Sequence, residues 1–155
     1  MTLSPGQRLT LNGIAQGYIA DRVAQLMRAQ GVGDVLIDTG EILALGAPAD
    51  APAWPVTIAG EAQPRALTGR AIATSAPMGT VLDRTRRIGH ILDPRDGIPA
   101  PRRIRQVSVS AQSAALVDAL STGLCLALDA AEARVMLGHV KDARLESLQT
   151  TAETL

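Results

Sequence analysis

Aromatic residues are almost absent from this sequence, which contains one Trp, one Tyr and no Phe among 155 residues. The hydrophobic core must therefore be built from Ala, Leu, Ile and Val, which are plentiful in a chain that is 46% hydrophobic. Proteins that bind single-stranded nucleic acid stack the bases on aromatic side chains. The scarcity of aromatic residues argues against that class of partner.

Net charge, cysteine pairs and long apolar runs are also lacking. Basic and acidic residues number 15 each, so electrostatics gives no reason to expect binding to nucleic acid or to an acidic membrane surface. The single cysteine, Cys125, excludes an internal disulfide and is expected to be a buried thiol within the apolar run GLCLAL. No apolar run approaches the roughly 18 residues of a membrane-spanning helix. No signal peptide is visible at the start, MTLSPGQRLT.

The periodicity of apolar residues predicts a single α+β domain over 1–155, with a mixed sheet and two or three packed helices. Helices are predicted at 14–30, 113–128 and 130–140. The predicted strands lie at 35–46 (two strands joined by a Gly turn), 54–60, 65–75 (with a turn at Thr68-Gly69) and 105–111. A polar, frayed tail is expected at 150–155.

Two of these predictions specify which side chains face the core. The apolar stripe of the first helix is expected to be formed by Ile14, Ile19, Val23, Leu26 and Met27. In the strand RQVSVSA, the two valines are expected on one face and the serines on the other.

The segment LNGIAQGY places Gly13 and Gly17 at the start of the first helix. Glycine lets the backbone approach a ligand closely, and the amides of a helix N-terminus favour phosphate. Glycine near a helix start is also common in ordinary proteins, so this segment indicates phosphate binding only weakly.

The region 81–103, rich in Gly, Pro and charged residues, is expected to be a long functional loop. Within it, His90 lies three residues before Asp93 and a Pro turn. A turn would hold both side chains outward, where His can act as a general acid or base near neutral pH. The simpler alternative is an Asp-Pro turn beside an exposed His.

The segment VDALSTGL places polar residues inside the otherwise apolar second long helix. Ser113 is a suitable N-cap for this helix. Asp118 and Thr122 are four residues apart and share one helix face, with Ser121 beside them. Such a set of oxygen ligands suits Mg²⁺ or Ca²⁺ and not zinc. The alternative is that Thr122 bonds back to its own helix while Asp118 pairs with an arginine.

Taken in order, these segments resemble the FAD:protein FMN transferases of the ApbE type. That family shows D-L-G-G-I-A-K-G-Y before a helix, then N-x-G-G, T-S, H-I-[IL]-D-P-x-T-G-x-P, V-x-V and A-D-A-L-[AS]-T-[AG]-L. The corresponding stretches here are TLNGIAQGYIADR, DTGE, ATSA, HILDPRDGIPA, VSVSA and VDALSTGL. The resemblance runs from about Thr10 to Leu128, and its most specific parts are HILDP and DALST.

The resemblance implies an activity and a set of binding residues. Members of the family bind FAD and a divalent metal ion, usually Mg²⁺, transfer FMN to a Thr or Ser hydroxyl of an acceptor flavoprotein, and release AMP. His90, as a proton carrier, and Asp118 would be the catalytic residues. The residues implied to hold the metal ion are Gly13, Asp118, Ser121 and Thr122. The residues implied to contact FAD are Thr10, Gln16, Thr74, Ser75 and Leu92.

Several positions depart from the family pattern. Thr10 replaces an Asp, Asn12 a Gly, Gln16 a Lys and Asp96 a Thr, and one residue is missing at DTGE. The loss of the Lys removes a cation from the neighbourhood of the phosphates.

Members of the family are about twice as long, so the chain corresponds to their C-terminal half. It is therefore expected to expose an apolar face that a missing N-terminal half or a second copy would cover. Three functions stay open: Mg²⁺-dependent FMN transfer, a non-catalytic FAD-binding accessory role, and an incomplete or degenerate member. The compartment also stays open, because family members are often exported to the periplasm as lipoproteins while no signal peptide is visible here.

Overall fold

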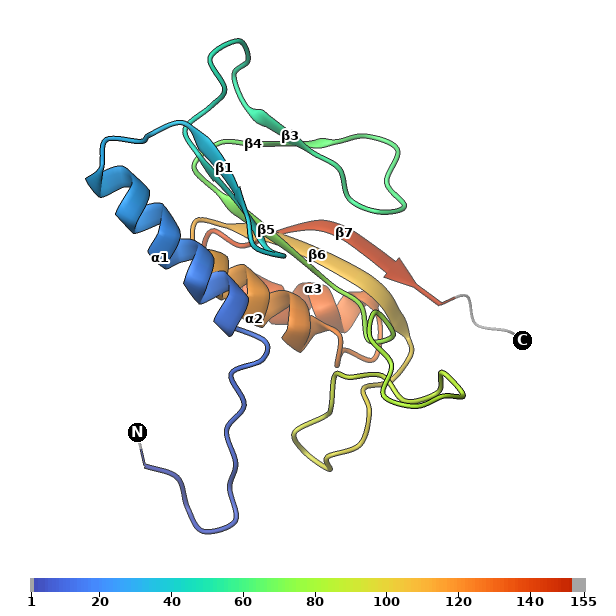
Figure 1. Cartoon of the computed structure of the whole chain (residues 1–155). Helices are drawn as coiled ribbons and strands as arrows, with labels where there is room; N and C mark the ends of the chain where they lie inside the picture. The colour runs from blue at the N-terminus through green and yellow to red at the C-terminus, as the bar shows by residue number, and fades with distance from the viewer. Residues whose placement is uncertain (1, 152–155) are drawn as a thin grey trace.

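The computed structural model of the chain describes residues 2–151 and has an α+β architecture, as expected (Figure 1). Its three helices are α1 (Ala15–Ala29), α2 (Ala114–Leu124) and α3 (Ala130–Gly138). The strands are β1 (Val35–Asp38), β2 (Ile42–Leu45), β3 (Trp54–Val56), β4 (Arg65–Leu67), β5 (Ala71–Ser75), β6 (Ile104–Ala111) and β7 (Arg144–Thr150). Within the described range, each helix is too short or too polar to span a bilayer.

The main sheet has five strands in the order β1-β2-β5-β6-β7, and β3 and β4 form a separate hairpin. Every strand pair in residues 2–151 is antiparallel, so the sheet is not of mixed direction as the sequence suggested. The connections explain this difference. The chain returns antiparallel to the neighbouring strand through a turn, through the β3–β4 hairpin, through a long loop and through a pair of helices. Among residues 2–151, no single crossover helix links two parallel neighbours.

The edge strand β7 is the one element that the sequence pattern did not reveal. Its residues are mostly half-buried and it pairs with β6 through two irregularities in register, so it lacks a clear alternation. Thr150 therefore belongs to the sheet edge and not to a frayed tail, and the amide of the next residue, Thr151, donates to the Arg103 carbonyl at 3.0 Å. The rest of the predicted tail, 152–155, lies outside the described residues.

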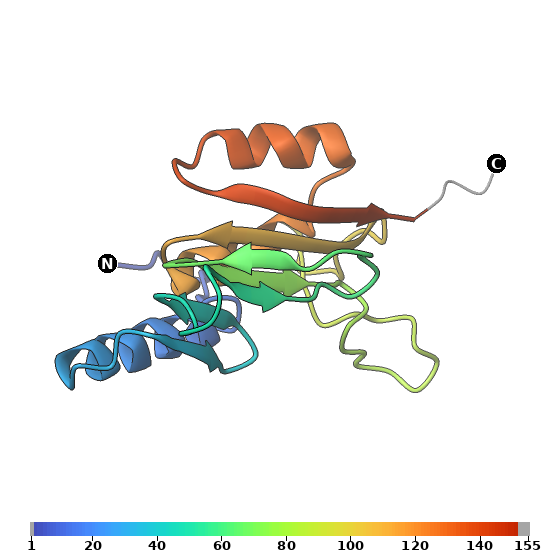
Figure 2. The ribbon, with the colours of Figure 1, turned by 90° about the horizontal axis from the view of Figure 1, so that it is seen from above.

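Strand β6 separates the two faces of the sheet as its alternation predicts. Val107 and Val109 are completely buried in the main core, which lies between the sheet and the helices. Ser108 and Ser110 are equally buried on the opposite face, where the Ser108 and Thr74 hydroxyls lie 2.8 Å apart. Helices α1 and α2 cover the apolar face, α3 lies beside β7, and the β3–β4 hairpin lies over the other face (Figures 1 and 2).

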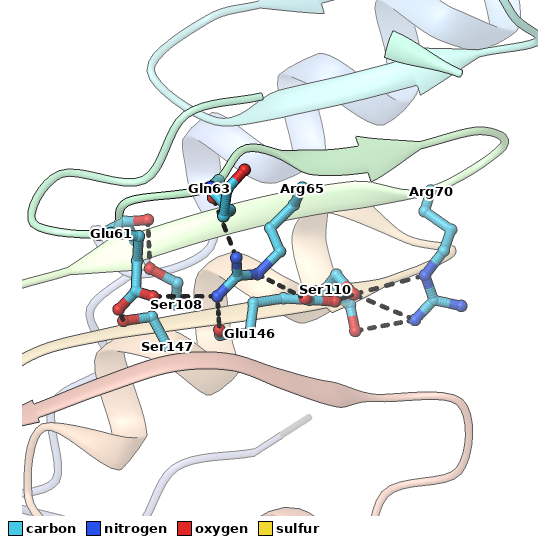
Figure 3. A network of polar contacts seen from close by, with 9 residues as sticks. Glu61, Gln63, Arg65, Arg70, Ser108, Ser110, Glu146 and Ser147 are labelled. Atoms are coloured by element: carbon cyan, nitrogen blue, oxygen red, sulfur yellow. Dashed lines mark hydrogen bonds and ion pairs between the residues drawn. The ribbon is translucent and has the colours of Figure 1, made fainter. Parts of the chain in front are cut away.

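A polar network fills part of that second face, between the hairpin and β7 (Figure 3). The Arg65 guanidinium donates to a carboxylate oxygen of Glu61 at 3.1 Å and to the Glu146 carbonyl at 2.8 Å. The Ser147 hydroxyl donates to the other Glu61 oxygen at 2.6 Å. Since these groups satisfy one another, they attach the hairpin to the sheet without an unpaired charge.

The face of α1 that packs contains small residues together with Val23 and Met27, which are two of the five residues in the predicted apolar stripe. Gly17, Ala20 and Ala24 are buried, whereas Ile19 and Leu26 are 52% and 63% exposed. Small side chains let α1 lie close to α2. Ile14, Ile19 and Leu26 are left exposed on the outer side of α1.

Two residues of α1 fix its contact with α2. A methyl group on Gly17 would lie 2.2 Å from the Ala114 carbonyl oxygen, so only glycine fits there. One turn later, the Asp21 carboxylate accepts hydrogen bonds from the amides of Ala114 and Ala115, at 2.8 and 3.0 Å, and from the Ser113 hydroxyl at 2.8 Å. Asp21 thus binds the positive end of α2, for which Ser113 is the N-cap as predicted.

Cys125, at the end of α2, is completely buried, as expected. Its thiol donates to the Ser121 carbonyl with a sulfur–oxygen distance of 3.3 Å. Burial raises the pKa of the Cys125 thiol to about 12, so this group is structural and unreactive.

Replacing Gly17 tests whether the close helix contact holds the fold together. We expect Gly17→Ala to lower the free energy of unfolding by about 1–3 kcal/mol, because the backbone of α2 must move away. Gly123→Ala, at a position with open space in α2, should instead raise it by about 0.5–1 kcal/mol. Urea denaturation of both variants measures the difference, and equal behaviour would contradict this account of the contact.

Candidate functional site

A cavity of about 260 Å³ opens where the start of α1, the β1–β2 turn, the end of β5 and α2 meet. Its lining is mainly polar. It includes six residues that the sequence analysis singled out: Gln16, Thr74, Ser75, His90, Asp118 and Thr122. Asn12, Glu41 and Thr80 also line it and were not predicted.

A second cavity of about 430 Å³ shares part of this lining, namely Asn12, His90 and Thr122. Three further residues from the predicted set line it: Thr10, Gly13 and Leu92. Leu82 and Ile91 add apolar surface. The structure therefore brings every predicted site residue except Ser121 to one of two adjoining cavities, the first polar and the second more apolar.

Asp118 is buried but not paired with an arginine in the part of the chain that the structure describes. One carboxylate oxygen, Oδ2, accepts a hydrogen bond from the Gly17 amide at 3.0 Å. Thr122 lies one helical turn further on, and a methyl group on Gly13 would touch its side chain at 2.9 Å. The alternative of an arginine-paired carboxylate is therefore not observed, and Asp118, Thr122 and Gly13 come together.

Ser121 lies behind the cavity lining and is completely buried. Its hydroxyl donates to the Asp118 carbonyl at 3.2 Å and lies 2.8 Å from the Ser75 hydroxyl. Since the one proton of Ser121 is used by the carbonyl, Ser75 is the donor in the pair. Ser121 thus orients Ser75, whose oxygen is also 3.4 Å from that of Thr122.

His90 is exposed at both cavities, as predicted, and its Nδ1 lies 3.1 Å from the Thr80 carbonyl oxygen. A carbonyl only accepts, so Nδ1 carries the proton in this contact and the neutral ring keeps a lone pair on Nε2. Asp93, expected to point outward with His90, is instead buried. Hydrogen bonds from Arg95 lower the pKa of Asp93 to about 2, so this carboxylate holds the turn.

Glu41, directly before β2, is the acidic cavity residue that the sequence analysis missed. Only 6% of it is exposed, and its Oε2 has no hydrogen-bond partner among residues 2–151. Burial raises the pKa of the Glu41 carboxyl from its ordinary 4.5 to about 8, with smaller effects from the negative charges of Asp118 and Asp38. A Glu after the turn Asp-Thr-Gly looks like an exposed hairpin residue, so nothing in the pattern could reveal it.

The donor atoms around the polar cavity fit a hard divalent cation. Asp118 is the only residue with a carboxylate in the predicted set, and burial raises its pKa while the Gly17 amide opposes the shift. The described residues hold no group of three or more His, Cys, Asp or Glu side chains suited to a metal ion, so hydroxyl and backbone oxygens would complete the set. Such oxygen ligands match Mg²⁺.

The raised pKa of Glu41 predicts a pH-dependent stability. Because the folded-state pKa lies above the unfolded value, the stabilisation is complete below about pH 4.5 and is lost as the pH rises through about 8. We expect Glu41→Gln to match the parent at pH 4.5 and to be more stable by roughly 2–4 kcal/mol at pH 8.5. Urea denaturation in EDTA measures this, and parallel pH profiles for the two proteins would contradict it.

Comparison with known proteins supports the resemblance found in the sequence. The FAD:protein FMN transferase of Treponema pallidum (strain Nichols) is 34% identical over 134 residues, which cover 76% of this chain and 37% of that protein. One from Klebsiella pneumoniae (strain 342) is 37% identical over 114 residues, covering 68% of this chain and 34% of that protein. The chain thus spans little more than one third of the length of these relatives.

Solved structures share the fold. The ApbE protein of Thermotoga maritima superposes with a TM-score of 0.78 at 25% identity, over 95% of this chain and 52% of that one. The flavinyl transferase ApbE of Pseudomonas stutzeri, in its apo form, gives 0.71 at 30% identity, over 85% and 43%. A sequence model of the ApbE family matches residues 2–145, nearly the whole chain. This chain therefore belongs to the ApbE family.

Proposed function

We propose that this chain takes part in the Mg²⁺-dependent transfer of FMN from FAD to a Thr or Ser hydroxyl of an acceptor flavoprotein. The observation that carries the proposal is that Asp118 and Thr122 line the polar cavity, while Gly13 lies against Thr122 and lines the adjoining cavity. The relatives are named FAD:protein FMN transferases, a name that covers the transfer of FMN from FAD to a protein. Because the chain spans about one third of their length, we propose that it supplies the part corresponding to their C-terminal half.

Charge supports the need for a metal ion. Neither described cavity is lined by Lys or Arg, and the position that carries a Lys in the family pattern is Gln16. A pyrophosphate placed here would meet the buried carboxyl groups of Asp118 and Glu41, which repel it when ionised. A divalent cation held by Asp118, Thr122 and the backbone at Gly13 would supply the missing positive charge and stabilise the phosphoryl group under attack.

The residues of the chain would position the reactants and move one proton. The acceptor hydroxyl oxygen forms a bond to phosphorus, the pyrophosphate bond breaks, and AMP leaves. His90 is placed to take the hydroxyl proton on Nε2, since its Nδ1 is held by Thr80. Leu82 and Leu92 give the larger cavity apolar walls against which an aromatic ring of FAD can pack, while Thr74 and Ser75 offer hydroxyl groups to its polar parts.

The surface of α1 bears on how the site is completed. Tyr18, Ile19 and Leu26 are exposed there, although residues of this kind are usually covered. We propose that an N-terminal half like that of the longer relatives, or a second copy of the chain, covers this face and adds to the pocket.

Replacing Asp118 tests the proposed function. We expect Asp118→Asn to lower FMN transfer by about 100-fold or more, because the cation loses its principal ligand. FMN fluorescence of the acceptor flavoprotein on a denaturing gel, after incubation with FAD and Mg²⁺, measures the transfer. Asp50→Asn, an exposed carboxylate outside the cavities, should behave as the parent does.

The outcomes separate the three functions. Transfer by the parent that stops in EDTA supports the proposal. Retention of FAD without transfer would favour a non-catalytic accessory protein. No FAD binding, together with an unchanged melting temperature in Mg²⁺, would favour a degenerate member, since a ligand at 100 times its dissociation constant adds about 2.7 kcal/mol of stability.

A further inference from the structure

The β1–β2 turn holds the carboxyl group of Glu41 in a fixed position at the polar cavity. The backbone of Glu41 is held by the hairpin, because its carbonyl accepts a hydrogen bond from the Thr39 amide at 3.1 Å and β2 begins at the next residue. The side chain lines the cavity that Asp118 lines from the opposite element, α2. Two acidic groups from distant parts of the chain therefore border the same small space.

The described residues provide no hydrogen-bond or charge partner that would explain an acidic side chain at position 41. Its Oε2 is buried without a hydrogen-bond partner in residues 2–151, and no Lys or Arg lines the cavity. His90 also borders this space, but it is exposed and its ring contacts the Thr80 carbonyl. An unpaired carboxyl group in this setting costs free energy that an apolar side chain would not. The cost is explained if a ligand from solution meets the group.

A cation is the ligand that the surroundings select. Asp118 keeps Oδ1 free of hydrogen bonds from the described residues, since the Gly17 amide binds Oδ2. Thr122 adds a hydroxyl oxygen to the same cavity. Two carboxyl groups and a hydroxyl around a polar cavity of about 260 Å³ make a set of hard oxygen donors. An anion would meet the two acidic groups without a Lys or Arg in the lining to offset them.

We propose that Glu41 is a further ligand of the divalent cation, so that the ion is bound between the β1–β2 hairpin and α2. The inference rests on the cation site of the proposed function and is independent of FMN transfer. In this arrangement the ion links the end of the sheet to the helix that carries Asp118, and two carboxylates balance its double positive charge.

Mn²⁺ binding to the full chain without FAD, followed by electron paramagnetic resonance of the free ion, tests the inference. The variants are Glu41→Gln, Asp118→Asn and Asp38→Asn. Asp38 is the matched control, because it is an exposed carboxylate of the same hairpin and its Asn variant keeps an oxygen for the Gly40 amide. Thermal unfolding in EDTA confirms that each variant is folded.

We expect Glu41→Gln to weaken Mn²⁺ binding roughly 10–100-fold, since losing even an outer partner of a metal ligand has such an effect. Asp38→Asn should change the dissociation constant by less than about fivefold, because exposed charges interact weakly. Equal weakening by both variants would overturn the inference, as it would show a general effect of charge. If Mn²⁺ binding is unchanged in Glu41→Gln but lost in Asp118→Asn, the role of Glu41 is overturned while the cation site at Asp118 stands. Absence of Mn²⁺ binding in the parent would overturn the cation site as well.

Discussion

The hydrogen bond between the Gly17 amide and the Asp118 carboxylate is the interaction on which the site depends. It exists because α1 lies against α2 without a side chain between them, and because Asp21 binds the N-terminus of α2 one turn later. Together these contacts fix both the position and the rotation of α2. Thr122 and Asp118 then face the loop that precedes α1, where Asn12 and Gly13 complete the wall of the cavities.

The two faces of the sheet are stabilised by different kinds of interaction. The face under the helices is apolar and supports the position of α2, while the opposite face contains serines, glutamates and arginines that satisfy one another. The cavity differs from both, since its acidic groups have no basic partners. Under the proposed function, the positive charge opposite a phosphate group in this cavity would come from an ion in solution.

Local patterns revealed most elements of the fold, because helices and central strands carry their own periodicity. The three helices, the β1–β2 hairpin and β6 follow from such patterns, whereas β7 does not, since an edge strand with an irregular register has no regular alternation. The packing face of α1 was predicted only in part, since Val23 and Met27 pack against the core while Ile14, Ile19 and Leu26 are exposed. Large apolar residues usually mark the buried face, but here the close approach to α2 selected Gly17, Ala20 and Ala24.

The residues of the site likewise fall into those that the sequence predicts and those that it does not. His90, Asp118 and Thr122 could be singled out because their spacing within a loop or a helix is characteristic. Glu41 could not, because its burial results from tertiary packing, which brings it to the same cavity as Asp118 of the distant helix α2. Asp93 illustrates the converse: its position in an Asp-Pro turn was evident, but its partner, Arg95, turned it inward.

The separation of Gly17 and Asp118 along the chain, 101 residues, has a consequence for biosynthesis. At the usual 5–20 residues per second, the ribosome needs roughly 5–20 s to produce the second helix after the first. During that interval α1 lacks its contact with α2, and the residues of this contact are open to chaperones and proteases. Helix α1 is thus synthesised well before the helix that protects it, and the polar cavity that Asp118 lines forms only after α2 has left the ribosome.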